Sequence, residues 1–193
     1  MKLKIDTREQ APLNFKEGVF AEIVREGLPV GDYWCEVEGA EIPIVFERKS
    51  LGDLFGTMTS GYARFKREMA RARQAGITLV LIIEGSMKDV AKGYQYSKFD
   101  GNAMLKKLFM LWIRYDLFPV FCEDRRTASR FIEETFSAVA RNYKAGSKKD
   151  DVTTTADESE VTISAQDNDR MDAGDSLERA GLGTASSDRG SSG

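Results

Sequence analysis

The sequence predicts an α/β protein in which one mixed β-sheet is flanked by α-helices. Short apolar runs rich in strand formers alternate with longer segments whose apolar residues recur at helical spacing. The core-forming composition stops near Gly146, so the folded part is a single domain of ordinary size. We expect this domain over residues 1–146, followed by an acidic, Ser/Asp/Gly-rich disordered tail over 147–193.

The first part of the domain is predicted to form a strand, a helix and a β-hairpin. Leu3–Ile5 is typical of a short strand, and Phe15–Glu26 has apolar residues at the spacing of an amphipathic helix. Tyr33–Phe46 is rich in strand formers. Its strong interruptions are Gly39 and Pro43, which indicates a hairpin.

Two helices and a buried strand are expected next. Ser50 can cap a helix over residues 51–58. A longer helix over Tyr62–Ala75 has its apolar residues on one face. Ile77–Ile83 is a continuous apolar run with β-branched residues, which is typical of a strand buried on both faces.

The last part of the domain is predicted to be a helix, a strand and a helix, over Asn102–Tyr115, Leu117–Phe121 and Arg126–Tyr143. The first of these helices is apolar around more than half its circumference, from Met104 to Ile113. One apolar face is enough for the core of a monomer, so we expect a subunit interface on this helix.

The charge is divided unevenly along the chain. Residues 1–149 hold 25 Lys and Arg against 20 Asp and Glu, a net charge of +5. Residues 150–193 hold 3 against 11, a net charge of −8, so the overall −3 hides a basic domain with an acidic tail. The basic domain indicates an anionic partner, and we hypothesise that the tail competes with that partner.

The composition excludes several kinds of chemistry. The chain has no His, which excludes a Ser-His-Asp triad, a His acid/base pair and a His-ligated zinc. Cys35 and Cys122 are isolated in apolar surroundings, which favours core residues over a disulfide or a catalytic thiol. The chain opens without a signal peptide and has no apolar run long enough for a bilayer, so we expect a cytoplasmic, nucleoid-associated protein without a membrane partner.

Two acids and a lysine gather at strand ends. Asp32 comes just before the hairpin, and Glu47, Arg48 and Lys49 directly follow an apolar run. Side chains alternate along a strand, so Glu47 and Lys49 share a face. This arrangement predicts a catalytic site. A plain ion-pair network is the alternative, and it is less favoured because the absence of His leaves no competing site.

Charge also gathers after the first strand, at Asp6, Arg8 and Glu9. Strand exits are a common place for active-site groups, although a solvated turn is the plainer interpretation. Arg48 would point to the face opposite Glu47, where it can hold Asp6 or Asp53.

The helix over 62–75 carries five cations and a single acid, Glu68. Cations this close repel one another unless an anion is present, so a phosphate-contacting face and a solubilising face are both open interpretations. The candidate DNA-binding cations are these helix residues and the arginine after the first strand: Arg8, Arg64, Lys66, Arg67 and Arg71.

Taken together, these motifs resemble the XPF-type nucleases. The residues that match the family's G-D-…-E-R-K-x-x-x-D signature and its upstream D-x-R-E element are Gly31, Asp32, Glu47, Arg48, Lys49 and Asp53, with Asp6, Arg8 and Glu9 before them. The resemblance covers Leu3 to Tyr143. It implies a restriction-endonuclease-like fold and a DNA endonuclease that cuts branched or flap DNA in repair or recombination. The apolar face from Met104 to Ile113 adds the expectation of a homodimer.

The chain departs from the family pattern in three places. In the family an arginine usually follows a glycine directly, whereas here Tyr62 and Ala63 separate Gly61 from Arg64. Glu68 stands where a glutamine is often found. The family's tandem helix-hairpin-helix domain has no counterpart after Gly146.

The expected chemistry is metal-dependent hydrolysis, because cleavage of a phosphodiester develops negative charge that hard divalent cations stabilise. We expect Asp32 and Glu47 to hold Mg²⁺ or Mn²⁺, with Asp6 as a further candidate ligand. Lys49 would position the attacking water or take part in proton transfer, and Arg8 would bind a phosphate. The full set of candidate catalytic residues is Asp6, Arg8, Glu9, Asp32, Glu47, Arg48, Lys49 and Asp53.

Two other functions stay open. The chain can be a catalytically silent DNA-binding or scaffold subunit of a nuclease complex, against which the intact set of acids and lysine argues. It can also be a partner-binding module that acts through its acidic tail, but the tail has no recognisable motif.

Overall fold

The computed structural model describes residues 1–147, except for the side chains of 143–147. The predicted tail lies outside the described residues from position 148 on. Ser147, which the sequence assigned to that tail, is instead the last residue of the final helix. Among the helices of the described part, none has both the length and the apolar character that a membrane span requires.

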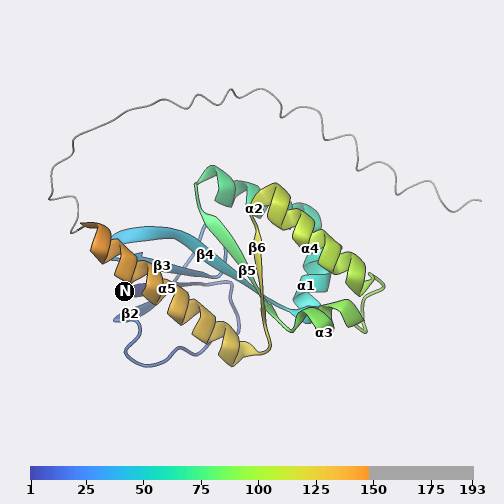
Figure 1. The fold of residues 1–193 in the computed structure, drawn as a ribbon, viewed down its shortest axis with the longest axis horizontal. Coiled ribbons are helices and arrows are strands. Elements are labelled where there is room, and N and C mark those ends of the chain that lie inside the picture. Colours follow the sequence, from blue (N-terminus) through green and yellow to red (C-terminus); the bar gives the residue numbers. More distant parts are fainter. Residues whose placement is uncertain (148–193) are drawn as a thin grey trace, which may run out of the picture. The chain divides into compact units, whose positions relative to one another are not determined.

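Six strands form one mixed sheet in the order β2-β1-β3-β4-β5-β6 (Figure 1). The strands are β1 (Lys2–Asp6), β2 (Glu22–Glu26), β3 (Tyr33–Val37), β4 (Ala40–Ser50), β5 (Thr78–Glu84) and β6 (Phe118–Cys122). β1 runs parallel to β2 and antiparallel to β3, whereas β4, β5 and β6 are parallel to one another. β3 and β4 pair antiparallel as the predicted hairpin.

Helices cover both faces of the sheet, which confirms the predicted α/β class (Figure 1). They are α1 (Leu51–Met58), α2 (Tyr62–Gln74), α3 (Met87–Lys92), α4 (Gly101–Tyr115) and α5 (Arg125–Ser147). On one face, buried residues of α1 to α4 pack against Val45 and Leu81. On the other, α5 packs against Phe46 and Ile82. We call these the α2 face and the α5 face.

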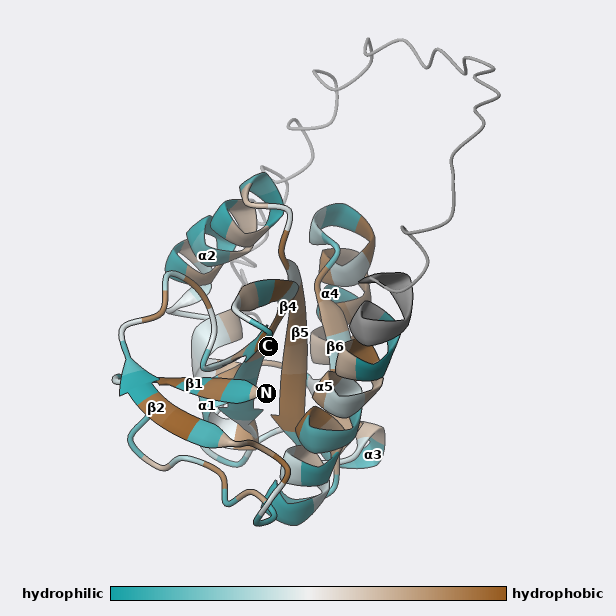
Figure 2. Cartoon of the chain, turned by 90° about the vertical axis from the view of Figure 1, so that its left-hand side faces the viewer, coloured by the Kyte–Doolittle hydropathy of each residue, from teal (hydrophilic) through white to brown (hydrophobic). Residues whose placement is uncertain are grey.

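Strand alternation decides which residues reach which face. Figure 2 shows β5 as hydrophobic along its length, as expected for a strand covered on both sides. In β4, Val45 belongs to the α2-face core and Phe46 to the α5-face core. The next residues, Glu47, Arg48 and Lys49, continue this alternation, so the strand sends charged groups to both faces.

β4 contains Pro43 in its interior without losing its pairing. The register with β3 shifts between the pairs Glu36–Glu41 and Trp34–Val45, and pairing with β5 begins only at Ile44. Pro43 therefore sits where no ladder hydrogen bond is required of its nitrogen.

The predicted helix over Phe15–Glu26 is wrong. Gly18 takes a left-handed φ of +80°, and Glu22–Glu26 forms the edge strand β2. Phe15 and Phe20 instead pack edge to face in a loop, with ring centroids 5.4 Å apart, and fill the core beneath α5. Their apolar spacing reflects core filling by an irregular segment rather than a helical face.

The sequence analysis missed α3, a helix of six residues. Ser86 caps it, and Asp89 completes a capping box in which each side chain bonds the other residue's backbone N–H. This Ser-x-x-Asp pattern is the signal that predicts the helix start.

Candidate active site

Asp32 is fixed by the backbone around it. The preceding Gly31 has a left-handed φ of +66°, and a Cβ there would lie 2.2 Å from Val45 Cγ1, so only glycine fits. The Asp32 N–H donates to the Phe46 carbonyl at 2.7 Å, and the Asp32 carbonyl accepts from the Asp6 N–H at 2.9 Å. The Asp32 carboxylate accepts the backbone N–H of Arg48 at 2.8 Å. Asp32 is therefore held against the end of β4.

Glu47 and Lys49 lie on the α2 face, as the alternation predicts, and form an ion pair there. Their side chains are only 7% and 14% exposed. The Lys49 ammonium lies 5.9 Å from the centroid of the Phe65 ring on α2. The pair is thus enclosed between the sheet and α2.

Burial makes the ionised form of both acids costly. It raises the pKa of Asp32 to about 6, and it raises the pKa of Glu47 above its ordinary value with a further contribution from the charge of Asp32. Burial alone would lower the pKa of Lys49, but the charge and hydrogen bond of Glu47 outweigh it and raise that pKa. Asp32 and Glu47, which we call the acid pair, therefore lack sufficient positive charge nearby.

Glu68 on α2 is a site residue that was not among the candidates predicted from the sequence, although it was noted as the single acid of this helix and as a departure from the family pattern. Its Oε1 accepts the N–H of Gly31 at 3.1 Å. Its charge contributes to raising the pKa of Asp32, Glu47 and Lys49, so it faces this same cluster. The available signal was a lone acid on a helix of five cations.

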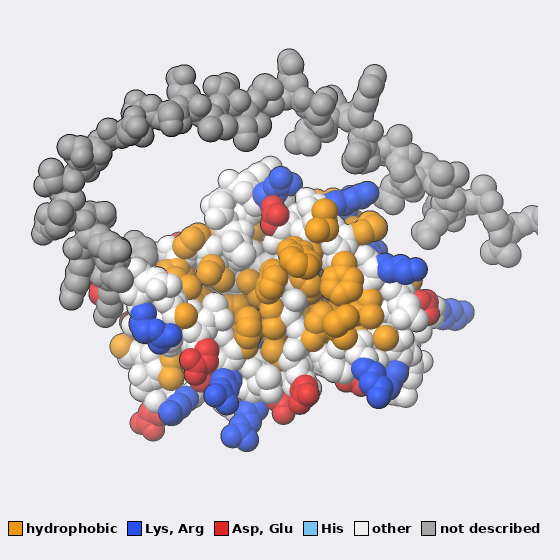
Figure 3. All heavy atoms as spheres, viewed as in Figure 1, with side chains coloured by type: hydrophobic (Ala, Val, Ile, Leu, Met, Phe, Trp, Pro, Cys, Tyr) orange, Lys and Arg blue, Asp and Glu red, His pale blue; other side chains and the backbone are white. Residues whose placement is uncertain are grey.

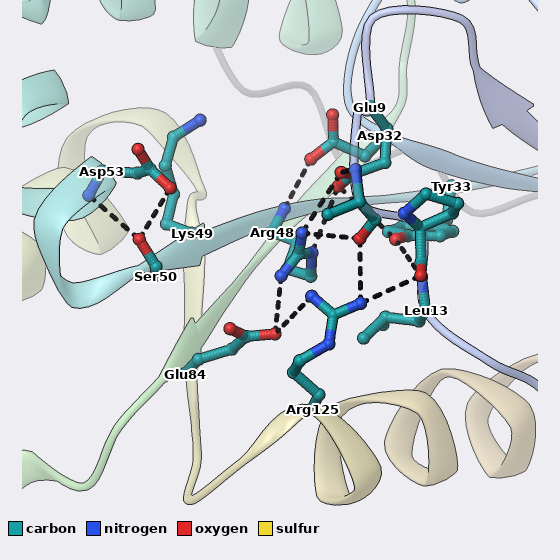
Figure 4. Close-up of polar contacts among 12 residues, drawn as sticks. Glu9, Leu13, Asp32, Tyr33, Arg48, Lys49, Ser50, Asp53, Glu84 and Arg125 are labelled. Carbon is teal, nitrogen blue, oxygen red and sulfur yellow. Dashed lines mark hydrogen bonds and ion pairs between the residues drawn. The ribbon is translucent and has the colours of Figure 1, made fainter.

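Arg48 lies on the α5 face within a balanced set of charges (Figure 4). Its guanidinium donates to Glu9 at 3.1 Å and to Glu84 at 2.6 Å, and Arg125 of α5 lies 3.8 Å from Glu84. We call these four residues the Arg48 network. The prediction that Arg48 holds Asp6 or Asp53 is wrong, because both acids have other partners.

Asp53 belongs to the start of α1. Its carboxylate bonds the Ser50 hydroxyl at 2.6 Å, and its N–H donates to the same hydroxyl at 3.2 Å (Figure 4). Its side chain is exposed. The hydrogen bonds of Asp53 are with Ser50 and not with the acid pair, and the predicted cap by Ser50 is confirmed.

Asp6 is fully buried, and both its oxygens are occupied. Arg8 donates to them from its backbone N–H and two guanidinium nitrogens at 2.6 to 2.8 Å, and the Leu28 N–H donates at 2.8 Å. The hydrogen bonds of Arg8 lower the pKa of Asp6 to about 2. Asp6 thus anchors the turn after β1, and the geometry does not fit its predicted role as a metal ligand. Arg8 holds Asp6 bidentately, although its side chain is 69% exposed.

Four of the five predicted DNA-binding cations lie along α2, and Arg8 lies in the turn after β1. Arg64, Arg67 and Arg71 are exposed, whereas Lys66 is half-buried with its ammonium 5.8 Å from the Tyr62 ring centroid. Three of the predicted cations therefore face solvent on the helix that also carries Glu68 toward the acid pair.

The acid pair is the donor set that fits the expected Mg²⁺ or Mn²⁺. Carboxylate oxygens are the ligands these ions prefer, and Mg²⁺ commonly takes only one or two of them from the protein. No group of three or more acid or cysteine side chains within residues 1–142 is arranged to hold a metal ion. A cation here would thus be held by the acid pair with other oxygen ligands, and its charge matches the excess of buried negative charge.

Comparisons with known proteins show a family and a fold that the chain shares. The family model of the ERCC4 domain matches residues 5–135, more than half of the chain. The solved structure of XPF from Aeropyrum pernix is 17% identical with a TM-score of 0.56, over 86% of this chain and 70% of that chain. XPF from Aeropyrum pernix in complex with DNA is 19% identical with a TM-score of 0.54, over 73% of this chain and 65% of that chain. No curated protein sequence matches the chain.

Proposed function

Because the chain belongs to the ERCC4 domain family, we propose that it is a divalent-metal-dependent DNA endonuclease that cuts branched or flap DNA in repair or recombination. The family match confirms the predicted resemblance to XPF-type nuclease domains. The observation that carries the proposal is the acid pair, buried beside Lys49 and short of positive charge. The intact acids and lysine argue against a catalytically silent scaffold subunit.

The chemistry follows from the groups at the end of β4. Asp32 and Glu47 would hold Mg²⁺ or Mn²⁺, which when bound would supply Lewis-acid stabilisation of the phosphate oxygens and activation of a water molecule. Lys49 lies beside Glu47, where its ammonium would donate hydrogen bonds that orient the attacking water or the phosphate, or would take part in proton transfer.

DNA would approach over α2, where Arg64, Arg67 and Arg71 are exposed. A guanidinium group can donate two hydrogen bonds to the oxygens of one phosphate, so these three arginines are suited to contact the DNA backbone. Contacts of this kind are independent of base sequence. This agrees with recognition of a DNA shape rather than a sequence.

A second copy of the chain is the proposed partner on α4 and β6. Figure 3 shows a broad hydrophobic patch over these two elements. Its large residues are exposed by 38 to 79%, and they are Phe109, Met110, Trp112, Ile113 and Phe118. The patch adjoins the open edge of the sheet at β6, and Trp112 and Phe118 pack edge to face 5.5 Å apart. Exposed patches of this kind mark protein interfaces.

Light scattering of the full chain at micromolar concentration tests this interface. We expect the mass of a dimer, and the mass of a monomer for Ile113→Glu, because Ile113 is the most exposed large apolar residue of the patch at 79%. A monomeric wild-type chain contradicts the homodimer.

Cleavage of a DNA panel tests the proposed activity. The full chain is incubated with flap, fork, splayed-arm and four-way-junction substrates, with Mg²⁺, with Mn²⁺ or with EDTA. We expect cleavage of at least one branched substrate with a divalent cation and none with EDTA. Binding of these substrates without cleavage under any of the conditions contradicts the endonuclease and favours the scaffold subunit.

A further inference from the structure

The acid on α2, Glu68, bonds to the sheet instead of to its own helix's arginines. Its carboxylate reaches the N–H of Gly31, 37 residues away in sequence, at 3.1 Å. It is half-buried, whereas Arg64 and Arg71, the cations four residues before it and three after it, are exposed. Such neighbours on a helix often pair with an acid. The bond to Gly31 indicates that Glu68 supports the turn before β3 rather than pairing with these arginines.

Gly31 is the residue that sets the backbone of Asp32. Because Gly31 has a left-handed φ and no Cβ, the turn can pack closely against Val45 of β4. The next peptide is held by the bonds of Asp32 to Phe46 and Asp6. The contacts of Asp32 are with residues of the sheet. The hydrogen bond that Glu68 accepts from the Gly31 N–H adds a contact from α2.

The helix itself is firmly seated. Phe65 and Met69 are buried in the α2-face core at 2% and 1% exposure. They flank Glu68 along the helix, so its carboxylate has little freedom to move relative to the sheet. The same helix carries exposed arginines next to Glu68, at Arg64 and Arg71.

We propose that Glu68 is a positioning residue for the cleavage reaction: its bond to Gly31 sets the carboxylate of Asp32 against Glu47 and ties that carboxylate to the arginine-bearing helix. This inference rests on the proposed nuclease function. A misplacement of a catalytic group by about 1 Å costs on the order of a hundredfold in rate, so one supporting hydrogen bond has a measurable effect.

Three variants of the full chain separate this role from alternatives. Glu68→Ala removes the acceptor, whereas Glu68→Gln keeps an oxygen acceptor at the same place. Glu17→Ala is the matched control, an exposed glutamate in the loop between β1 and β2. We expect Glu68→Ala to lower the cleavage rate at saturating DNA by about tenfold or more with little change in DNA affinity, and Glu68→Gln to restore most of that rate. A normal rate in Glu68→Ala, or no recovery in Glu68→Gln, overturns the proposal.

Hydrogen exchange of the Gly31 amide gives a result that does not depend on cleavage. In the metal-free protein, we expect this amide to exchange about tenfold faster in Glu68→Ala and at the wild-type rate in Glu68→Gln and Glu17→Ala. Unchanged exchange in Glu68→Ala overturns the positioning role. If the wild-type chain cuts no DNA, the nuclease function fails, and the exchange data still decide whether Glu68 holds Gly31.

Discussion

The two faces of the sheet at the end of β4 differ in charge balance, although one strand supplies both. On the α5 face, the Arg48 network has two acids and two arginines. Burial alone would raise the pKa of Glu9, but the hydrogen bond and charge of Arg48 outweigh it and lower that pKa. On the α2 face, Asp32, Glu47 and Glu68 surround Lys49, and the pKa values of the acid pair are raised.

The balanced charges of the α5 face serve the stability of the fold, whereas the unbalanced charges of the α2 face indicate the reaction site. A balanced network holds its own charges and has no need of a further ion. In an unbalanced buried cluster the carboxylates repel one another, and a bound cation removes this repulsion. Such a cluster is typical of a functional site. Arg48 connects the two, because its side chain belongs to the α5 face while its backbone N–H holds the carboxylate of Asp32.

The largest expected effect comes from breaking the balanced face. Arg48→Met leaves Glu9 and Glu84 buried without their main partner, so we expect the free energy of unfolding to fall by about 3 kcal/mol or more. Urea denaturation measures this loss. Arg130→Met, an exposed position on α5, is the control and should change stability by less than about 0.5 kcal/mol. Equal stabilities for the two variants would show that the Arg48 network is not structural.

A smaller loss of stability is expected for Asp6→Asn. The folded pKa of Asp6 is about 2, below its ordinary value, so its contribution is present at neutral pH and is lost as pH falls toward 2. We expect Asp6→Asn to lose about 2 kcal/mol at pH 7 and to lose less at pH 3. Mn²⁺ affinity should stay unchanged. A weakened affinity would restore the original assignment of Asp6 as a metal ligand.

The acid pair predicts the opposite dependence on pH. Because its pKa values are raised on folding, the folded metal-free protein keeps protons that the unfolded chain releases, and stability falls as pH rises from 5 to 8. The chain has no His to titrate in this range, so the slope reports mainly these acids. We expect Glu47→Gln to flatten the slope by about 1 kcal/mol over that range. A wild-type stability that is constant between pH 5 and 8 contradicts the charge imbalance.

The smallest effect is expected at Asp53. Asp53→Ala removes the carboxylate that bonds Ser50 at the start of α1, which should cost about 0.5 to 1 kcal/mol of stability in thermal unfolding. Cleavage should stay at the wild-type rate, because the carboxylate of Asp53 is bonded to Ser50 and to neither residue of the acid pair. A loss of cleavage without a matching loss of stability would return Asp53 to the catalytic set.

Local rules predicted the part of the site that one strand and its hairpin contain. Strand alternation placed Glu47 and Lys49 together and Arg48 opposite them, and the apolar run after Ile77 indicated the strand beside them. These inferences need only the period of a strand and the position of buried residues.

The remaining parts depend on contacts between distant segments. The partners of Arg48 depend on the register of β4 with β5, which places Arg48 opposite Ile82. They also depend on the packing of α5, which brings Arg125 to Glu84. The approach of Glu68 to Gly31 depends in the same way on how α2 packs. The false helix over Phe15–Glu26 arose because core-filling apolar residues in a loop imitated a helical period.

Calorimetric titration of Mn²⁺ into the full chain tests most directly whether the unbalanced face is a cation site. Glu47→Gln and Glu84→Gln make the same change in charge, one on each face of the sheet. We expect Glu47→Gln to weaken Mn²⁺ binding by at least about tenfold and Glu84→Gln to leave it unchanged. Equal effects of the two variants, or wild-type binding by Glu47→Gln, would contradict this expectation.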